Sequence, residues 1–202
     1  KMGINLTWGG GVSYLEDLND GDTSITNLLN DHDTGRLIQQ SYYGVQQNSE
    51  YTPGYYNGSM WAYNPVQGGN QYNESSKIVD LRIDENSIYI KCRPLDWAKE
   101  KEYITPSYME ATYSLDGELV HVSCRFVDFS GYPEYYTTQE LPAFYCIEPF
   151  NRFVYYGGDA PWTGDKNYSY ENELIFWPDA GYPNFQATEN WSAFIGDFDD
   201  SF

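Results

Sequence analysis

Residues 31–44 carry side chains of the types that bind hydroxyl groups. Arg36 and Gln40 offer hydrogen-bonding groups, and Tyr43 adds an aromatic ring with a polar edge. Read with the two-residue period of a β-strand, residues 36–43 place polar or aromatic side chains on both faces. A strand that packs on a hydrophobic core would alternate apolar and polar residues instead. We therefore expect this strand to line a polar groove.

A second aromatic and polar segment, residues 44–71, shows neither helix nor strand periodicity, and we interpret residues 51–69 within it as a binding loop. A segment of this length without regular structure is usually a functional loop or a linker, and its aromatic content is too high for a linker. Trp61 and Tyr63, and Trp162 in a later Gly/Pro-rich loop, offer flat faces on which a pyranose ring can stack. The alternative is that these rings plug the ends of the fold. The predicted ligand-binding residues are Trp61, Tyr63, Trp162, Tyr43, Arg36, Gln40, Asn64 and Gln67.

Carboxylates raise the alternative of catalysis. A glycosidase needs two of them roughly 5–10 Å apart, one kept protonated by apolar surroundings. Glu140 precedes the apolar run 141–144, which makes it the most readily desolvated, and Asp33 would be its partner. Glu110 and His121 fall on one face of a predicted hairpin, where they would form either an acid–base pair or a surface hydrogen bond. The carboxylates considered for catalysis are Asp33, Glu110, Asp128, Glu140 and Glu148.

Asp31 and Asp33 are the residues considered for a metal site, in which they would bind Ca²⁺ together with Asn30 and backbone carbonyl groups. The spacing of a complete calcium loop is missing, and an Asp33 that pairs with Arg36 or caps the turn explains the same residues. No other cofactor is expected. The three cysteines have no metal-binding spacing, and we expect buried thiols at Cys92, Cys124 and Cys146.

The composition limits the classes of partner. The chain has 202 residues, a net charge of −19 and 18% aromatic residues, among them 21 Tyr and 6 Trp. An acidic surface repels phosphate groups, so we expect neither nucleic acid nor an anionic membrane as a partner. No apolar run reaches the roughly 18 residues that a membrane-spanning helix needs. Neutral polymers, cations and basic partners are compatible with this charge.

Alternation of apolar and polar residues predicts two β-hairpins. The first joins residues 79–83 to 88–92, and the second joins 108–115 to 118–127 around Asp116-Gly117, a type I′ turn dipeptide. In each hairpin one face becomes apolar, and a slip of one residue would mix apolar and polar residues. The predicted pairs are Ile83–Ile88, Leu81–Ile90, Val79–Cys92, Arg82–Tyr89 and Asp80–Lys91, then Tyr113–Val120, Ala111–Val122, Met109–Cys124 and Glu110–Ser123.

Short strand-like runs and frequent turns continue to the C-terminus. Runs at 141–147, 152–156, 173–177 and 191–195 are separated by Gly/Pro-rich turns, and no long amphipathic helix is visible. This pattern predicts an all-β fold, an antiparallel β-sandwich of jelly-roll or supersandwich type with long aromatic-rich loops. We expect a single domain over residues 1–202, cut as a module from a longer multimodular protein.

Three short segments resemble carbohydrate-active β-sandwich proteins, in particular the galactose-mutarotase-like supersandwich and secreted sugar-binding modules of polysaccharide-degrading bacteria. The resemblance rests on Asp33-Thr34-Gly35-Arg36 with residues 39–43, on Trp61 with residues 64–69, and on residues 139–143. It implies a concave sheet that binds glycans, and an extracellular protein, secreted or on a bacterial cell surface. Supersandwich domains are longer than this chain, so a complete catalytic fold is not implied.

These observations favour a non-catalytic carbohydrate-binding module that recognises a neutral plant-type polysaccharide of the plant cell wall. Ring stacking would supply affinity, and hydrogen bonds to sugar hydroxyls would supply selectivity. One alternative is a glycoside hydrolase or polysaccharide lyase domain, or half of one. A second alternative is an adhesion or protein-interaction module. The expected partners are polysaccharides or oligosaccharides, and other modules of the same polypeptide.

Overall fold

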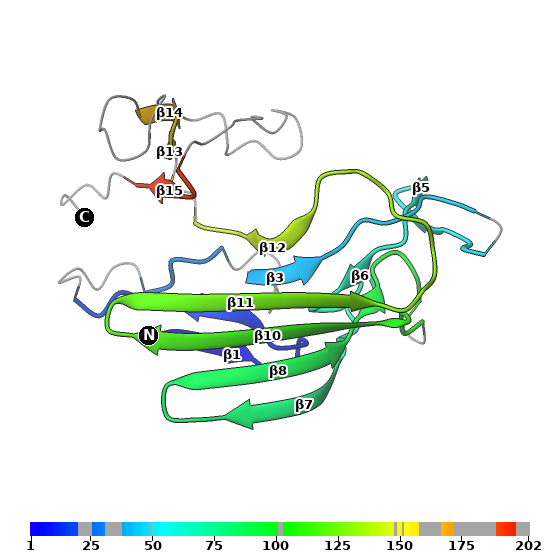
Figure 1. Ribbon diagram of the computed structural model, residues 1–202, viewed down its shortest axis with the longest axis horizontal. Helices are drawn as coiled ribbons and strands as arrows, with labels where there is room; N and C mark the ends of the chain where they lie inside the picture. The colour runs from blue at the N-terminus through cyan, green and yellow to red at the C-terminus, as the bar shows by residue number, and fades with distance from the viewer. Residues whose placement is uncertain are drawn as a thin grey trace. The chain divides into compact units, whose positions relative to one another are not determined.

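A computed structural model describes residues 1–19, 26–30, 38–48, 50–100, 103–147, 149–150, 152–157, 167–171 and 189–196 (Figure 1). In these residues the regular structure consists of β-strands, and all strand pairs are antiparallel, which confirms the predicted all-β class. The chain divides into two compact units. Unit 1 comprises residues 1–21 and 31–145, and unit 2 comprises residues 22–30 and 146–202. The single domain expected over residues 1–202 stays a prediction.

The first sheet of unit 1 brings together segments that are far apart in the sequence. Its strands follow the order β1-β2-β3-β6-β9, and β12 pairs with β3. The strand β3 is buried along its whole length, so it lies in the interior of unit 1. The strands are β1 (Met2–Asn5), β2 (Gly11–Leu15), β3 (Ile38–Ser41), β6 (Pro65–Val66), β9 (Leu95–Asp96) and β12 (Glu140–Phe144).

The second sheet of unit 1 is built from the two predicted hairpins, in the order β11-β10-β8-β7. These are the long strands in the foreground of Figure 1, with both hairpin turns at the same end. Along β10, buried and half-buried residues alternate from Ser107 to Ser114, the pattern of a strand with one face toward a core. The strands are β7 (Lys77–Ile83), β8 (Ser87–Arg93), β10 (Ser107–Asp116) and β11 (Leu119–Asp128).

The register predicted for the first hairpin is confirmed at four of its five pairs. Ile83–Ile88, Leu81–Ile90, Arg82–Tyr89 and Asp80–Lys91 are all partners. The fifth is wrong, because Ile78 and not Val79 lies opposite Cys92. A bulge between Ile78 and Asp80 leaves one residue of β7 without a partner on β8, and alternation alone cannot locate such an insertion.

The register predicted for the second hairpin is wrong by two residues. The loop is Gly117-Glu118, with Gly117 at a φ of 59°, and Asp116 pairs with Leu119. Glycine at the first loop position is the type II′ arrangement, not the predicted type I′. An even shift keeps every side chain on its predicted face, so the inner face is still apolar. The observed pairs are Tyr113–Val122, Ala111–Cys124, Met109–Phe126 and Glu110–Arg125.

Side chains join the two sheets of unit 1 to each other. Gly10, beside β2, lies against Ile90 of β8, which has no solvent exposure. Gln67, after β6, donates from Nε2 to the hydroxyl of Tyr113 on β10 at 3.3 Å. Gln40 of β3 donates from Nε2 to the carbonyl of Glu110 at 2.9 Å. Two antiparallel sheets in face-to-face contact are the arrangement that a β-sandwich has.

Unit 2 contains a three-stranded sheet of order β14-β13-β15, comprising β13 (Arg152–Tyr156), β14 (Asn167–Glu171) and β15 (Ser192–Ile195). The predicted runs at 152–156 and 191–195 therefore correspond to strands. The predicted run at 173–177 lies outside the described residues. In the described part of the chain, no helix is long and apolar enough to cross a membrane.

Substitution of Gly10 tests the contact between the sheets. Gly10 has a φ of 79°, and a Cβ atom there would lie 2.3 Å from Cδ1 of Ile90. Gly58 has a similar φ of 77° but open space around it, so it is the matched control. We expect Gly10→Ala to lower the free energy of unfolding by roughly 2–4 kcal/mol, because overpacking adds to backbone strain. Gly58→Ala should lower it by about 1 kcal/mol. If urea denaturation gives the same loss of unfolding free energy for both variants, the contact between Gly10 and Ile90 does not contribute to stability.

Candidate functional site

Four of the predicted ligand-binding residues are buried. Tyr63 has no exposed surface, and Gln40, Asn64 and Gln67 are each 1% exposed. The prediction that their side chains line an open groove is therefore wrong. Tyr43 and Trp61 retain partial exposure. Arg36 and Trp162 lie outside the described residues.

The buried glutamines serve as partners for backbone groups. The strands β3 and β6 form a single ladder pair, Ser41–Val66, so other backbone groups nearby need side-chain partners. The Gln40 amide N–H donates to Oε1 of Gln67 at 3.1 Å, and Nε2 of Gln67 donates to the Gly9 carbonyl at 3.2 Å. Side-chain amides thus satisfy backbone groups in the interior of unit 1. This role explains why β3 carries polar side chains although it does not line a groove.

Tyr63 and Asn64 connect the interior to the surface. Tyr63 packs with Val45 and Tyr51 in a buried cluster, and its hydroxyl donates to Asp128 at 3.1 Å. Nδ2 of Asn64 donates to the Tyr42 carbonyl at 2.8 Å, while its Oδ1 accepts from the indole Nε1 of Trp61 at 3.1 Å. The buried Asn64 side chain therefore fixes the orientation of the Trp61 ring.

Trp61 belongs to a small hairpin formed by β4 (Gly54–Tyr56) and β5 (Ser59–Trp61). Its turn, Asn57-Gly58, has positive φ at both residues, which is the type I′ arrangement. In Figure 1, β5 lies at the end of unit 1 opposite the turns of the long hairpins. The loop predicted to lack periodicity over residues 51–69 thus contains regular structure at its aromatic centre.

Four aromatic rings meet at this hairpin, and we call Tyr43, Tyr56, Trp61 and Trp97 the aromatic platform. Trp61 is at the centre, with ring centroids 5.5 Å from Tyr56, 4.9 Å from Trp97 and 6.5 Å from Tyr43. Tyr56 and Trp97 are 4.6 Å apart at 66°, an edge-to-face geometry. The four rings fix one another, and each keeps part of its surface in solvent.

Backbone contacts hold the platform in place. Gly54 approaches the 97–99 segment so closely that a Cβ atom would lie 2.2 Å from the Ala98 carbonyl oxygen. The Trp97 N–H donates to the Asn64 carbonyl at 2.9 Å. Gln139 pairs with both backbone groups of Tyr43, accepting from its N–H at 2.7 Å and donating to its carbonyl at 2.8 Å. Three separate segments therefore position the four rings.

The opposite face of the small hairpin is also apolar and open. Tyr55 and Met60 are cross-strand partners there, with 60% and 47% exposure. Nε2 of Gln71 donates to the Tyr55 carbonyl at 2.8 Å, which ties the backbone of this strand to the chain beyond it. The hairpin therefore presents apolar surface on both of its faces.

A buried carboxylate lies close to the platform. Asp96 has no solvent exposure, and its Oδ2 accepts from the Tyr51 hydroxyl at 2.8 Å, whereas Oδ1 has no hydrogen-bond partner. Burial raises the pKa of Asp96 to about 6, although Tyr51 and the charge of Lys99 oppose the shift. The Lys99 ammonium lies 4.2 Å from the ring centre of Tyr51 and 3.9 Å from that of Tyr103. This network anchors the 97–99 segment beneath the platform.

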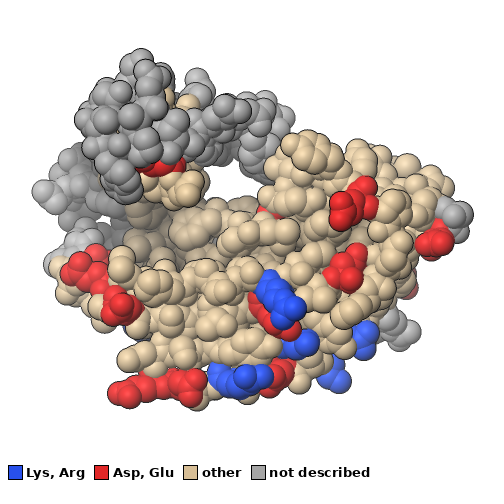
Figure 2. All heavy atoms as spheres, in the orientation of Figure 1, with Lys and Arg blue, Asp and Glu red and all other residues tan. Residues whose placement is uncertain are grey.

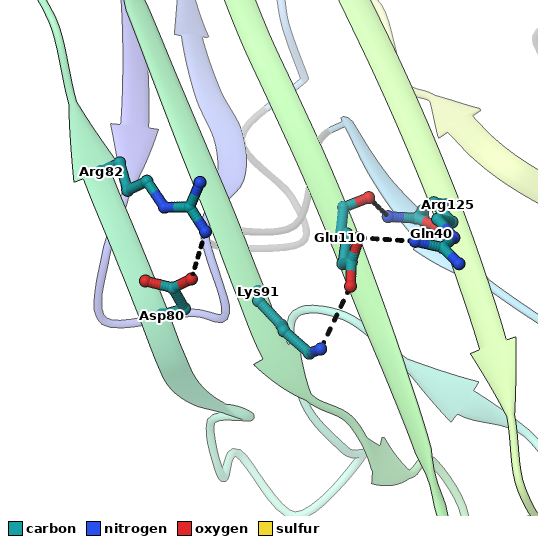
Figure 3. A network of polar contacts seen from close by, with 6 residues as sticks. All are labelled: Gln40, Asp80, Arg82, Lys91, Glu110 and Arg125. Carbon is teal, nitrogen blue, oxygen red and sulfur yellow. Dashed lines mark hydrogen bonds and ion pairs between the residues drawn. The ribbon is translucent and has the colours of Figure 1, made fainter.

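The predicted catalytic pair of Glu110 and His121 does not form. Glu110 forms ion pairs with Lys91 at 3.2 Å and with Arg125 at 3.5 Å (Figure 3). His121 is exposed and lies opposite Ser114, so it is four residues from Arg125 along β11, roughly 13 Å. The misjudged register placed the two side chains too close together.

The other predicted catalytic and metal residues are only partly described. Glu140 begins β12 opposite Ser41 and is half-buried. Asp31, Asp33 and Glu148 lie outside the described residues, so a Glu140–Asp33 pair and the proposed Ca²⁺ site stay predictions. In the described part of the chain, no group of three His, Cys, Asp or Glu side chains could hold a metal ion. Cys92, Cys124 and Cys146 are free thiols; Cys92 is buried as expected, whereas Cys124 and Cys146 are only half-buried, and burial raises the pKa of each.

Two platform residues, Tyr56 and Trp97, were not among the predicted site residues. A signal for Tyr56 was present, because Asn57-Gly58 between aromatic residues is a strong hairpin pattern. Trp97 has no comparable signal in the sequence. Its contact with Trp61 is a tertiary one, and no local pattern indicates it.

Titration of Asp96 provides a test of this network. The carboxyl takes up its proton near pH 6 in the folded protein but near pH 4 in the unfolded chain, so its contribution makes the folded state more stable as pH falls from 7 to 4. Asp96→Asn removes this dependence. We expect the free energy of unfolding of the wild type, relative to Asp96→Asn, to rise by on the order of 3 kcal/mol over that interval. Urea denaturation measures both free energies of unfolding. A difference between wild type and Asp96→Asn that stays constant from pH 7 to pH 4 would contradict the network.

The comparisons leave this site to be interpreted from its own geometry. No protein family model matches the sequence, and neither a curated protein nor a solved structure matches the chain. The resemblance to carbohydrate-active β-sandwich proteins therefore stays a prediction. The strongest functional feature of the described residues is the aromatic platform, with the exposed face of Tyr55 and Met60 beside it.

Proposed function

We propose that this protein is a non-catalytic module that binds neutral carbohydrate through the aromatic platform. The observation that carries the proposal is the cluster of four partly exposed rings centred on Trp61, which are held by edge-to-face and tilted ring contacts and by the hydrogen bond from Trp61 to Asn64. Tyr and Trp rings offer apolar faces with polar edges, which match the alternating C–H and hydroxyl groups of a sugar ring. Rings already held in position lose little conformational freedom on binding.

The charge distribution supports a neutral ligand. The chain has a net charge of −19, and Figure 2 shows carboxylates spread over the visible face. Five of the basic residues lie on the long-stranded sheet: Lys77, Arg82, Lys91, Arg93 and Arg125. None of the four platform residues is basic, and the net charge of −19 would repel an acidic polysaccharide or a nucleic acid. Polysaccharides of the plant cell wall that lack charged sugars fit this surface, and an extracellular location would give access to them.

The roles of the polar residues differ from those of the rings. Asn64 acts as a positioning residue, because it accepts the hydrogen bond of the Trp61 indole, whereas Gln40 and Gln67 bond backbone groups in the interior of unit 1. Tyr43 and Trp61 keep the ligand-binding role predicted for them, and Tyr56 and Trp97 join them. Hydroxyl groups of the sugar would meet the Tyr56 hydroxyl and two exposed polar residues, Asn57 in the hairpin turn and Ser59 at the start of β5.

A second function is favoured by Tyr55 and Met60. These side chains form an exposed apolar face of the small hairpin, and contiguous apolar surface commonly marks a protein contact. The same hairpin would then serve as an adhesion or protein-interaction element. Substitution of each face separately distinguishes the two functions, because Tyr56 and Trp61 lie on one face and Tyr55 and Met60 on the other.

Affinity electrophoresis tests the carbohydrate proposal. In gels that contain soluble β-glucan, xyloglucan or galactomannan, we expect the wild type to be retarded by at least one polysaccharide. Trp61→Ala and Tyr56→Ala should weaken that interaction at least tenfold, about 1.4 kcal/mol, because each removes a stacking surface. Tyr136→Ala, at an exposed tyrosine outside the platform, is the control and should change nothing.

Two results would contradict the proposal. The first is unaltered retention of Trp61→Ala and Tyr56→Ala. The second is a wild type that none of these polysaccharides, nor any neutral glycan on an array, retains. Loss of retention on Tyr55→Ala alone would move the binding surface to the opposite face of the hairpin.

A further inference from the structure

The strand β7 forms one edge of the long-stranded sheet. It pairs with β8 on one side, and among the described residues no strand pairs with its other side. Its apolar side chains are unusually open, since Val79, Leu81 and Ile83 are 45%, 39% and 62% exposed. An edge strand with exposed apolar residues is a template for pairing with another strand.

A ladder of alternating charges crosses this sheet and ends at β7. Cross-strand pairing places Asp80 beside Lys91, Lys91 beside Glu110 and Glu110 beside Arg125. Ion pairs join Glu110 to Lys91 at 3.2 Å and to Arg125 at 3.5 Å (Figure 3). From β11 to β7 the signs are therefore positive, negative, positive and negative. A positive side chain on a fifth strand would continue the alternation beyond Asp80.

That positive side chain is present on β7 itself. Arg82 lies two residues from Asp80 on the same face and forms an ion pair with it at 2.9 Å. If β7 of a second copy pairs antiparallel about Leu81, Asp80 of each copy lies opposite Arg82 of the other. The alternation then continues through the junction in both directions, and opposite charges in cross-strand positions are favourable.

The neighbouring registers do not give this match. Centring the pair on Asp80 places two Asp80 side chains opposite each other, and centring it on Arg82 does the same for two arginines. Like charges directly opposite are unfavourable. A shift of one residue places apolar side chains opposite charged ones. Only the register centred on Leu81 also pairs Leu81 with Leu81, and the bulge between Ile78 and Asp80 limits the regular pairing to residues 80–82 of each copy.

We propose that β7 is a homodimer interface, in which two copies of this chain join their long-stranded sheets edge to edge in the register centred on Leu81. The symmetry is isologous, as a two-fold dimer requires. The contact is small, so the association is weak and reversible. If the platform binds polysaccharide as proposed, each dimer carries two platforms and gains avidity for a polymer. The association itself does not depend on that function.

Charge reversal at the two positions tests both the interface and its register. Asp80→Arg gives a strand with two positive charges, and Arg82→Asp gives one with two negative charges. We expect sedimentation equilibrium to show wild-type dimers at roughly 0.1 mM protein, and each variant alone to dimerise at least tenfold more weakly. An equimolar mixture of the two variants should dimerise again, because every cross-strand pair is then of opposite charge.

Arg125→Asp is the matched control. It makes the same change in net charge as Arg82→Asp, but on β11 at the far edge of the sheet, and should leave dimerisation unaltered. Far-ultraviolet circular dichroism and the melting temperature establish that the variants are folded, and exposed ion pairs contribute little to stability. A wild type that is monomeric at this concentration would overturn the proposal. A mixture of the two variants that stays monomeric, or a control that dissociates, would do the same.

Discussion

A buried carboxylate constrains the part of unit 1 that carries the aromatic platform. Asp96 lies without solvent exposure between the Tyr51 hydroxyl and the Lys99 side chain, and one of its oxygens has no partner. A buried acid is costly unless its surroundings are fixed, so the segments around it have little freedom to move. The 97–99 segment directly follows this carboxylate and contacts the small hairpin through Ala98 at Gly54 and through Trp97 at Trp61.

A chain of polar contacts leads from this interior to the surface. Asn64 follows the buried Tyr63 and orients the indole of Trp61, while Gln139 fixes the backbone of Tyr43. Polar residues in the interior thus position the partly exposed rings for which we propose a binding role. Buried Asn and Gln side chains and partly exposed Tyr and Trp rings therefore have different structural roles in this chain.

The sequence predicts which face of a strand a side chain occupies better than it predicts which residue lies opposite or contacts that side chain. Alternation at Tyr113 and Val122 identified the apolar side of the long hairpin, yet the pairs shifted by two residues because the loop is Gly117-Glu118. The burial of Gln40 could not be predicted, because its hydrogen-bond partner Glu110 lies 70 residues away in the sequence. The sequence does not distinguish a glutamine that hydrogen-bonds to water from one that hydrogen-bonds to a buried carbonyl group. Trp61 was identified because loop aromatics are distinctive, whereas the contact with Trp97 depends on tertiary structure alone.

The most direct test of the account follows the indole N–H signals of the protein by nuclear magnetic resonance during titration with oligosaccharides of the polysaccharide that retards it. The account predicts that the signals of Trp61 and Trp97, assigned with Trp→Phe variants, shift together and saturate, while those of Trp8 and Trp191 do not move. Shifts confined to Trp8 or Trp191, or the absence of any shift at saturating oligosaccharide, would contradict the assignment of the binding surface to the aromatic platform.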